Sequence, residues 1–275
     1  MSSISAKRGK PARAAAQRPL RLLCTNDDGI LAFGLDCLVR AVEPLGEVTV
    51  VAPDREQSGT SHALTMQHPL RVKNRGPRRY QVDGTPTDCV MLALQALMPE
   101  PPDFVLSGIN HGQNMGEDVL YSGTVAAAME GLVLGVPSIA LSFAGGDRAG
   151  GAGDATLVEQ QLEAVTDLVR HIVTLDKLPP ATLFNVNFPP VAGPAIKGTR
   201  LTRLGRRVFS DAITRMKDPW GQEVFWIGGG TISWSGEPDS DYRAIAEGYV
   251  SVTPLHLDLT HDVMLDAAES WWRAP

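Results

Sequence analysis

Apolar and polar positions alternate along the chain in blocks that predict strands followed by helices. The apolar run Leu20 to Thr25 predicts a buried strand, and apolar residues at helical spacing follow it as far as Pro44. The run Val48 to Ala52 then predicts a second strand. Strand, helix and strand in this order predict a parallel βαβ unit with a right-handed crossover.

The same alternation continues through the middle of the chain. Thr85 resembles an N-cap, with Pro86 at the first helical position and Asp88 three residues after the cap, which predicts a helix through Met98. Ser122 is the expected cap of a later helix. We therefore predict an α/β fold, a Rossmann-like and mostly parallel sheet with helices on both faces. Its further strands are expected at 62–65, 70–73, 79–82, 103–106, 138–142 and 183–187, and its further helices at 126–134 and 157–175.

The pattern changes after residue 198. The strand-like segments Glu223 to Ile227 and Thr231 to Trp234 flank Gly228 to Gly230, which predicts a β-hairpin turned by the glycines. A small arm cannot bury its own aromatic residues, so it packs either against a partner subunit or back on its own domain. We expect a disordered basic tail over 1–19, an α/β core over 20–198, and a C-terminal hairpin with a closing strand and helix over 199–275.

The composition narrows the function classes. A chain of 275 residues with 43% hydrophobic and 20% charged residues is typical of a globular enzyme. The formal charge of -6 argues against binding of duplex nucleic acid through a basic surface, although a local phosphate pocket is compatible with it. Apolar runs of membrane-spanning length and a secretory signal are both missing from the sequence, so we expect neither a membrane partner nor export. Cys24, Cys37 and Cys89 form no CxxC pair, which favours the reducing cytoplasm.

The sequence predicts no catalytic or binding role for two segments. The first 19 residues contain five Lys and Arg residues and no acidic residue, which is typical of a disordered tail, with an organellar transit peptide as the alternative. Phe143 to Asp154 is rich in glycine and reads as a plain connector or as a lid, and no GK[ST] sequence follows that would make it a phosphate loop.

Three polar loops follow three of the predicted strands. They are Asn26 to Gly29, Asp54 to His62 and Ser107 to Tyr121. In an open parallel sheet such loops emerge at the carboxyl edge of the strands, where ligands bind near the topological switch point. Residues that are far apart in the sequence are therefore expected to converge at this edge.

The side chains in these loops are rich in oxygen donors. Adjacent carboxylates at the end of a buried strand are costly without a cation, and oxygen ligands suit Mg²⁺, Mn²⁺ or Ca²⁺. Each residue also has an ordinary structural explanation, such as a helix cap, a turn or a left-handed loop position. Their common place at the sheet edge favours a metal site, with these candidates: Asp27, Asp28, Ser58, Asn110 and Asn114.

Five segments occur in a characteristic order: TNDDGI, VAPDREQSGTSHALT, GTPTDCV, SGINHGQNMGEDVLYSGTVAAAMEG and EGYVSVTPLHLDLT. They resemble the motifs of the SurE family of stationary-phase survival proteins, which are metal-dependent 5′/3′-nucleotidases. The resemblance runs from about Leu20 to the C-terminal region and leaves out the basic tail and the glycine-rich loop. It implies that Asp27, Asp28, Ser58 and Asn110 bind Mg²⁺ or Mn²⁺ and serve catalysis. It also implies C-terminal elements exchanged between subunits, and hence a homodimer or homotetramer.

The expected reaction is hydrolysis of nucleoside 5′- and 3′-monophosphates to nucleoside and phosphate. The metal would bind a phosphate oxygen and activate a water, and Asp27 or Asp28 would orient that water or take its proton. The backbone N–H groups at the start of a helix would cradle the phosphate, together with the hydroxyls of its first residues. The expected substrate or phosphate contacts are Asn114, Ser122, Gly123, Thr124 and His62.

Three questions stay open at this stage. His62 is either a general acid for the leaving group or a structural hydrogen-bonding residue, and His111 is a weaker candidate. Ser58 is better explained as a metal ligand than as a covalent nucleophile, because no base is securely placed beside it.

A nicotinamide-dependent dehydrogenase is disfavoured because the first loop reads NDDG rather than GxGxxG. A non-catalytic nucleotide sensor is the other alternative, since it would bind nucleotide without releasing phosphate.

Overall fold

The structure is a computed structural model that describes residues 18–145, 152–175, 178–179, 181–210, 213–227 and 231–272. Most of the predicted tail, residues 146–151 of the glycine-rich loop and the three glycines at 228–230 lie outside these ranges. No helix within them is both long enough and apolar enough to cross a membrane.

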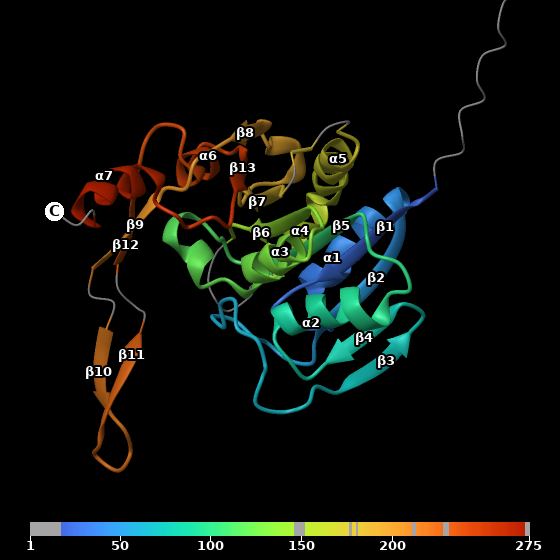
Figure 1. Cartoon of the computed structure of the whole chain (residues 1–275), viewed down its shortest axis with the longest axis horizontal. Helices are drawn as coiled ribbons and strands as arrows, with labels where there is room; N and C mark the ends of the chain where they lie inside the picture. Colours follow the sequence, from blue (N-terminus) through green and yellow to red (C-terminus); the bar gives the residue numbers. More distant parts are fainter. Residues whose placement is uncertain are drawn as a thin grey trace, which may run out of the picture.

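Within the described ranges, nine strands form one central sheet (Figure 1). Their order across the sheet is β3-β4-β2-β1-β5-β6-β7-β13-β8. The strands span Leu20–Thr25 (β1), Gly46–Pro53 (β2), Val72–Gly76 (β3), Arg79–Val82 (β4), Phe104–His111 (β5), Ser138–Phe143 (β6), Leu183–Phe188 (β7), Thr199–Leu201 (β8) and Val250–Leu255 (β13). Because β8 and β13 belong to this sheet, the core of the molecule continues past residue 198.

The order of the strands creates a switch point between β1 and β5. Strand β1 runs parallel to β2 on one side and to β5 on the other. From β2 the sheet continues to β4, whereas from β5 it continues to β6 and β7, all in parallel pairs. Ligands of open α/β sheets bind at the carboxyl ends of the two strands where the order reverses. In this chain those ends lead into Asp27 and Asp28 after β1 and into Asn110 and His111 at the end of β5.

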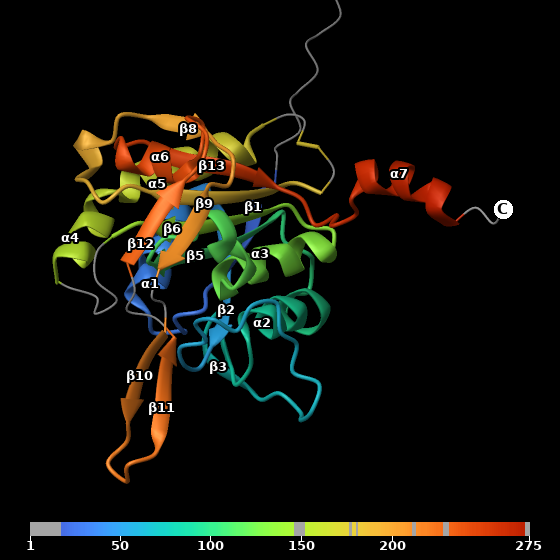
Figure 2. The same ribbon diagram turned by 90° about the vertical axis from the view of Figure 1, so that its left-hand side faces the viewer.

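Helices cover both faces of the sheet (Figure 2). Helices α1 (Phe33–Val42), α4 (Ala152–Gln160) and α5 (Leu162–Val173) pack together on one face, and α2 (Pro86–Leu92) and α3 (Gly123–Val133) pack together on the other. The predicted α/β fold with helices on both faces is confirmed. The remaining helical elements are Glu43–Leu45, Ala93–Leu97, Gly116–Leu120, Gly193–Ala195, α6 (Asp241–Ala246) and α7 (Asp262–Trp272).

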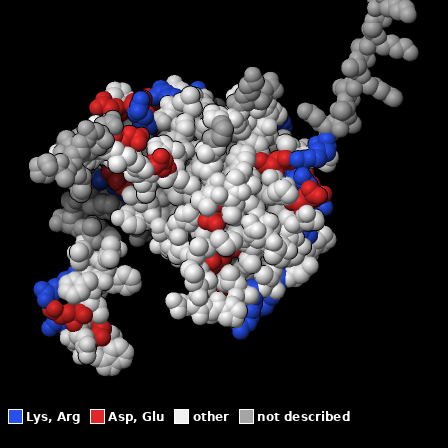
Figure 3. Space-filling model, in the orientation of Figure 1, with Lys and Arg blue, Asp and Glu red and all other residues white. Residues whose placement is uncertain are grey.

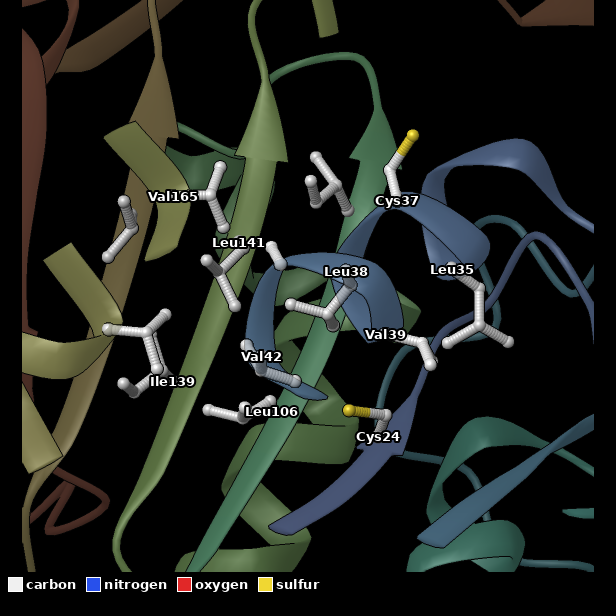
Figure 4. Close-up of a cluster of buried hydrophobic side chains, with 14 of the residues drawn as sticks. Cys24, Leu35, Cys37, Leu38, Val39, Val42, Leu106, Ile139, Leu141 and Val165 are labelled. Carbon is white, nitrogen blue, oxygen red and sulfur yellow. The ribbon is translucent and has the colours of Figure 1, made fainter. Parts of the chain in front are cut away.

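The larger apolar cluster lies between α1, α5 and the sheet (Figure 4). Leu35, Leu38 and Val42 recur at the spacing of one helix face and are fully buried. They pack with buried residues of the sheet such as Leu106 and Leu141. Burial of each such side chain contributes about 1.5–3 kcal/mol, so the strands that carry the polar loops are held in a rigid framework.

The helix start predicted at Thr85 is confirmed as a reciprocal capping box. The N–H of Asp88 donates to Thr85 Oγ1 over 3.1 Å, and the N–H of Thr85 donates to Asp88 Oδ2 over 2.8 Å. Thr65 donates to the same carboxylate through its N–H and its hydroxyl, over 2.9 and 2.6 Å. Residues 62–65 are therefore loop, because side chains rather than a neighbouring strand bind their backbone, and the predicted strand there is wrong.

Two further boundaries differ from the prediction. Strand β5 continues through Ser107 to His111, which was expected to be loop, because it pairs with β6 as far as His111 and Phe143 after a register shift. The single helix expected over 157–175 is two helices that meet at Gln161. Gln161 Nε2 donates to the carbonyls of Pro189 and Val191, so the side chain at this junction is fixed to the segment after β7.

The predicted glycine-turned hairpin is wrong in its pairing. Strand β11 (Glu223–Ile227) pairs with β10 (Ile213–Lys217), and β12 (Thr231–Ser235) pairs with β9 (Arg206–Ser210). The turn instead lies at 218–221, where Asp218 Oδ1 accepts the N–H groups of Trp220 and Gln222 over 2.9 and 2.8 Å. Gly221 supplies the positive φ of +82° that this turn requires.

The pair β10–β11 projects away from the body of the molecule (Figures 1 and 2). Phe225, Trp226 and Ile227 are 59%, 66% and 85% exposed. This part of the hairpin is therefore not folded back on its own domain. On the face shown in Figure 3, Lys and Arg occur in small groups next to Asp and Glu, and that face carries no continuous basic surface.

Candidate functional site

The loop after β1 is a tight turn fixed by backbone contacts. Asn26 Nδ2 donates to the carbonyl of Gly29 over 3.1 Å, and the N–H of Ile30 donates to the carbonyl of Pro53 over 2.8 Å. Gly29 has a φ of +103°, and a Cβ there would lie 3.3 Å from the carbonyl carbon of Arg55. The turn therefore requires glycine and holds Asp27 and Asp28 against the end of β2.

Asp27 is buried against the start of α3. It is 4% exposed, and the hydroxyl of Thr124 donates to its Oδ1. Burial raises the pKa of Asp27, while the hydrogen bonds from Thr124 oppose that change. Gly123 permits the close approach, because a Cβ there would lie 2.8 Å from the Cβ of Asp27. The positive end of the α3 dipole thus faces this carboxylate.

Asp28 lies beside β5. Its Oδ2 accepts the backbone N–H of His111 over 3.3 Å. Burial raises the pKa of Asp28 to about 6, and the negative charge of Asp27 adds to this effect. The two adjacent carboxylates therefore lie between α3 and β5, with both pKa values raised.

The loop after β2 brings Ser58 to the same edge of the sheet. The N–H of Gln57 donates to the carbonyl of Asp27 over 2.7 Å, which fixes this loop beside the first one. Ser58 is exposed, and its hydroxyl donates to Glu56 Oε1 over 2.9 Å. The charge of Glu56 contributes to the raised pKa values of Asp27 and Asp28. Glu56 was not among the predicted site residues, although it lies only two residues before Ser58.

Asn110 and Asn114 have different surroundings. Asn110 lies in β5 next to His111 and donates its Nδ2 to the carbonyl of Gly112 over 2.7 Å, so its Oδ1 is the atom suited to a cation. Asn114 is 7% exposed and donates its Nδ2 to the hydroxyl of Ser142 over 2.8 Å. The backbone carbonyl of Asn114 accepts hydrogen bonds from the Nδ2 atoms of Asn185 and Asn187 over 2.7 and 3.0 Å. The structure therefore binds Asn114 into a polar network with β6 and β7 and not directly to the two carboxylates.

The start of α3 was expected to hold the phosphate. Ser122 is confirmed as its N-cap, because its hydroxyl accepts the N–H of Val125 over 3.0 Å. The Thr124 hydroxyl is bound to Asp27. Both hydroxyls thus already have partners in the protein, and the start of the helix at Gly123 packs against Asp27.

His62 lies against the side of α3. Its Nε2 is 2.8 Å from Oε2 of Glu130, which is 4% exposed. Glu130 lies six residues after Thr124, about 9 Å further along the helix axis. The His62 ring is thus bound to the side chain of Glu130, while the N–H of the preceding Ser61 donates to the carbonyl of Tyr121 just before α3 begins, over 3.2 Å. Glu130 was not selected from the sequence, because a contact between residues 62 and 130 has no local signal.

A pocket of about 240 Å³ opens beside Asp28 and Asn110. It lies between α1, the end of β5 and α4. Among its walls, His111 Nε2 is 3.2 Å from Oδ2 of Asp154. Asp154 was not among the predicted site residues, because it lies at the end of the glycine-rich segment.

The donor set at the switch point fits a hard divalent cation. In the described part of the chain, no ion pair involves Asp27 or Asp28. The Oδ1 atom of Asn26, which is also buried there, accepts no hydrogen bond. The same described residues hold no group of three or more His, Cys, Asp or Glu side chains that could bind a metal. A cation would therefore need neutral oxygens, such as those of Ser58 and Asn110, in addition to the two carboxylates.

Comparisons with known proteins identify the family of the chain. The family model described as "Survival protein SurE" matches residues 22–211. A protein from Gemmatimonas aurantiaca named 5′-nucleotidase SurE is 64% identical over 256 residues, which cover 93% of this chain and 100% of that protein. A protein of the same name from Alkalilimnicola ehrlichii is 45% identical over 255 residues, or 92% of this chain and 95% of that one.

A solved structure has the same fold. The crystal structure of the SurE protein from Aquifex aeolicus superposes with a TM-score of 0.78 at 40% sequence identity. The match covers 91% of this chain and 99% of that chain. The similarity thus extends over nearly the full length of both chains.

Proposed function

Because the chain belongs to the SurE family, we propose that it is a metal-dependent phosphomonoesterase that hydrolyses nucleoside 5′- and 3′-monophosphates. Its named relatives are 5′-nucleotidases, which supports the nucleotide substrate and the release of phosphate. The observation that carries the proposal is the pair Asp27 and Asp28, which lies at the switch point beside the N-terminus of α3 and forms no ion pair with any residue that the structure describes.

Asp27, Asp28, Ser58 and Asn110 are the proposed metal ligands, and Mg²⁺ or Mn²⁺ is the proposed ion. Two carboxylates with neutral hydroxyl and amide oxygens suit these hard cations. The hydrogen bond from Ser58 to Glu56 leaves the lone pairs of the Ser58 oxygen free to ligate. When bound, such a cation neutralises charge on the phosphate and lowers the pKa of a bound water.

The two carboxylates have different roles in this proposal. Thr124 occupies one oxygen of Asp27 and fixes its orientation. Asp28 receives only the longer hydrogen bond from the His111 N–H among its described contacts. We therefore assign to Asp28 Oδ1 the orientation of the attacking water and the acceptance of its proton.

The N-terminus of α3 is the proposed phosphate site. The backbone N–H groups of Gly123 and Thr124 lie at the positive end of an 11-residue helix, which favours an anion. Ser122 keeps this end of the helix in place as its N-cap. The Thr124 hydroxyl donates to Asp27, so its proposed effect on the phosphate is indirect: it holds the carboxylate of Asp27 in position. Asn114 positions the loop through β6 and β7.

The hydrogen bond between His62 and Glu130 supports a structural role for the histidine. It fixes the loop that carries Ser58 to the side of α3. A general acid would have to reach the leaving oxygen near Asp28, whereas Nε2 of His62 is bound to the buried carboxylate of Glu130. We therefore assign His62 to loop positioning rather than to proton transfer.

The exposed apolar side chains of β10 and β11 support a homodimer or homotetramer. Ile213, Trp226 and Ile227 are at least 65% exposed, and a partner subunit would bury them. Cys24, Cys37 and Cys89 are free and buried, which supports the cytoplasm as the proposed location.

A metal-by-substrate activity panel tests the proposed function. The purified protein is treated with a chelator, and AMP, GMP and 3′-AMP are each offered with Mg²⁺, with Mn²⁺ and without metal. The proposal predicts phosphate release only with metal. A protein that only senses nucleotides would bind AMP and release no phosphate, and this result would contradict the enzyme assignment.

A further inference from the structure

The pocket beside Asp28 and Asn110 is small and partly lined by apolar side chains. Its walls include Phe33 from α1, Ile109 from β5 and Phe143 from β6. Its volume of about 240 Å³ is below the roughly 300–1,000 Å³ typical of sites that enclose a drug-sized ligand. The pocket therefore has room for one ring and not for a whole nucleotide.

Two polar side chains complete the wall on the α4 side. Asp154 Oδ2 is 3.2 Å from His111 Nε2, and the side chains are 16% and 33% exposed. Gly145 allows Asp154 and Phe143 to share this wall, because a Cβ there would lie 3.0 Å from Asp154 Oδ1 and 2.0 Å from a ring carbon of Phe143. The close packing around Gly145 holds Asp154 in place at the rim.

The place of the pocket determines which part of a nucleotide can enter it. In a nucleoside monophosphate, the ester oxygen joins the phosphate directly to the ribose. A phosphate held between the two carboxylates and the start of α3 therefore places the ribose next to Asp28 and Asn110, where the pocket opens. The base is one ring further away.

We propose that this pocket binds the ribose of the substrate and that Asp154 accepts hydrogen bonds from the ribose hydroxyls. The inference rests on the proposed nucleotidase function. One oxygen of Asp154 faces His111, and a carboxylate has further lone pairs for hydroxyl donors. Such charge-assisted hydrogen bonds are about twice as strong as neutral ones, so Asp154 distinguishes a sugar from other rings. Phe33 and Ile109 contact the apolar face of the sugar.

The test compares three phosphate esters on Asp154→Asn in the presence of Mn²⁺. AMP contains ribose and a base, ribose 5-phosphate contains the sugar alone, and 4-nitrophenyl phosphate contains a ring without hydroxyls. We expect KM for AMP and for ribose 5-phosphate to rise by about tenfold, since a hydrogen bond to a charged group is lost. KM for 4-nitrophenyl phosphate is expected to stay within about twofold. The matched control is Glu159→Gln on the same helix, whose carboxylate binds Arg40 over 2.7 Å and does not line the pocket.

A second variant and a binding measurement keep the test decisive if Asp154→Asn does not fold. Ala155→Phe places a ring in the pocket itself, so KM should rise for all three esters. In the absence of metal, adenosine should raise the melting temperature of the wild type and leave that of Ala155→Phe unchanged. Unchanged KM values in Ala155→Phe, or equal stabilisation of both proteins by adenosine, would overturn the proposal.

The outcomes separate this inference from the proposed function. A wild-type protein that hydrolyses none of the three esters with any metal would contradict the phosphatase assignment, and the adenosine measurement would still test the pocket. An active wild type whose KM for AMP is unaffected by Asp154→Asn would contradict the ribose pocket alone. An equal rise in KM for all three esters in Asp154→Asn would also overturn the ribose pocket, because Asp154 would then act on the phosphate site and not on the sugar.

Discussion

Gly123 and Asp27 approach each other so closely that the helix can carry no side chain at this point. A Cβ on Gly123 would lie 2.8 Å from the Cβ of Asp27 and 2.9 Å from its Oδ2. The start of α3 and the end of β1 are thus fitted to each other across the switch point. The position of the carboxylate that we assign to metal binding depends on this contact.

Substitution of Gly123 by alanine should displace Asp27. We expect Gly123→Ala to weaken Mn²⁺ binding and AMP turnover by about tenfold or more, because even a shift of about 1 Å at a catalytic site is costly. The fold should be retained, because alanine is favoured over glycine within a helix by about 1 kcal/mol. Val133→Ala at the exposed end of α3 is the control and should change neither property. Normal Mn²⁺ affinity in folded Gly123→Ala, measured by calorimetry, would contradict this role of the contact.

The raised pKa of Asp28 predicts a pH dependence of stability in the metal-free protein. Folding raises this pKa from 3.8 to about 6, so the folded protein binds the proton more tightly than the unfolded chain. The corresponding stabilisation of about 3 kcal/mol is present below about pH 4 and is lost as the pH rises through about 6. The substitution Asp28→Asn should remove this decrease in the free energy of unfolding with rising pH. Urea unfolding of both proteins with a chelator across this pH range measures the difference, and identical pH profiles would disprove it.

The pair His62 and Glu130 predicts a stability effect without a matching loss of catalysis. His62→Ala leaves the buried Glu130 without its hydrogen-bond partner, which should lower the free energy of unfolding by about 1–3 kcal/mol. Because Nε2 of the ring is bound to Glu130 and not to a reacting group, kcat for AMP should change by less than about threefold. General acids contribute about 10²–10⁴-fold to the rate, so a loss of kcat in that range would indicate a catalytic role for His62.

The paired strands β10 and β11 predict self-association. Replacing both Trp226 and Ile227 with serine should lower the oligomeric state, because these side chains are 66% and 85% exposed in the single chain and need a partner surface. The measurement is the molar mass by light scattering after size-exclusion chromatography. Lys217→Ser, on the neighbouring strand of the same hairpin, is the polar control. A monomeric wild type would contradict the prediction.

Much of the sheet and part of the candidate site were accessible from the sequence. The alternation of apolar runs and helical patterns predicted a mostly parallel sheet with the polar loops at its carboxyl edge. The observed order, in which β5 lies beside β1, brings Asp27, Asp28 and Asn110 to the same pair of strand ends. The capping box at Thr85 was also predictable, because both partners lie within one helical turn. These features follow from local spacing and from the rules of parallel sheets.

The contacts that the sequence did not reveal join distant residues or competing turns. Glu130 reaches His62 across 68 positions, and Asp154 reaches His111 across 43, so neither pair has a local pattern. In the hairpin, three glycines were the more conspicuous turn signal, whereas the structure turns at Asp218 and Gly221. Strand pairing over the full length of β10 and β11 decided between the two turns.

We propose that Asp27 and Asp28 bind the metal on which phosphate release from a nucleotide depends. The most direct test is Mn²⁺ titration of chelator-treated wild type and Asp27→Asn, with phosphate release from AMP followed in the same samples. The wild type should bind Mn²⁺ and gain activity in parallel, whereas folded Asp27→Asn should lose at least about a hundredfold in turnover, since metal-based stabilisation supplies several kcal/mol. Full turnover without metal, or near-normal turnover of Asp27→Asn, would contradict the claim.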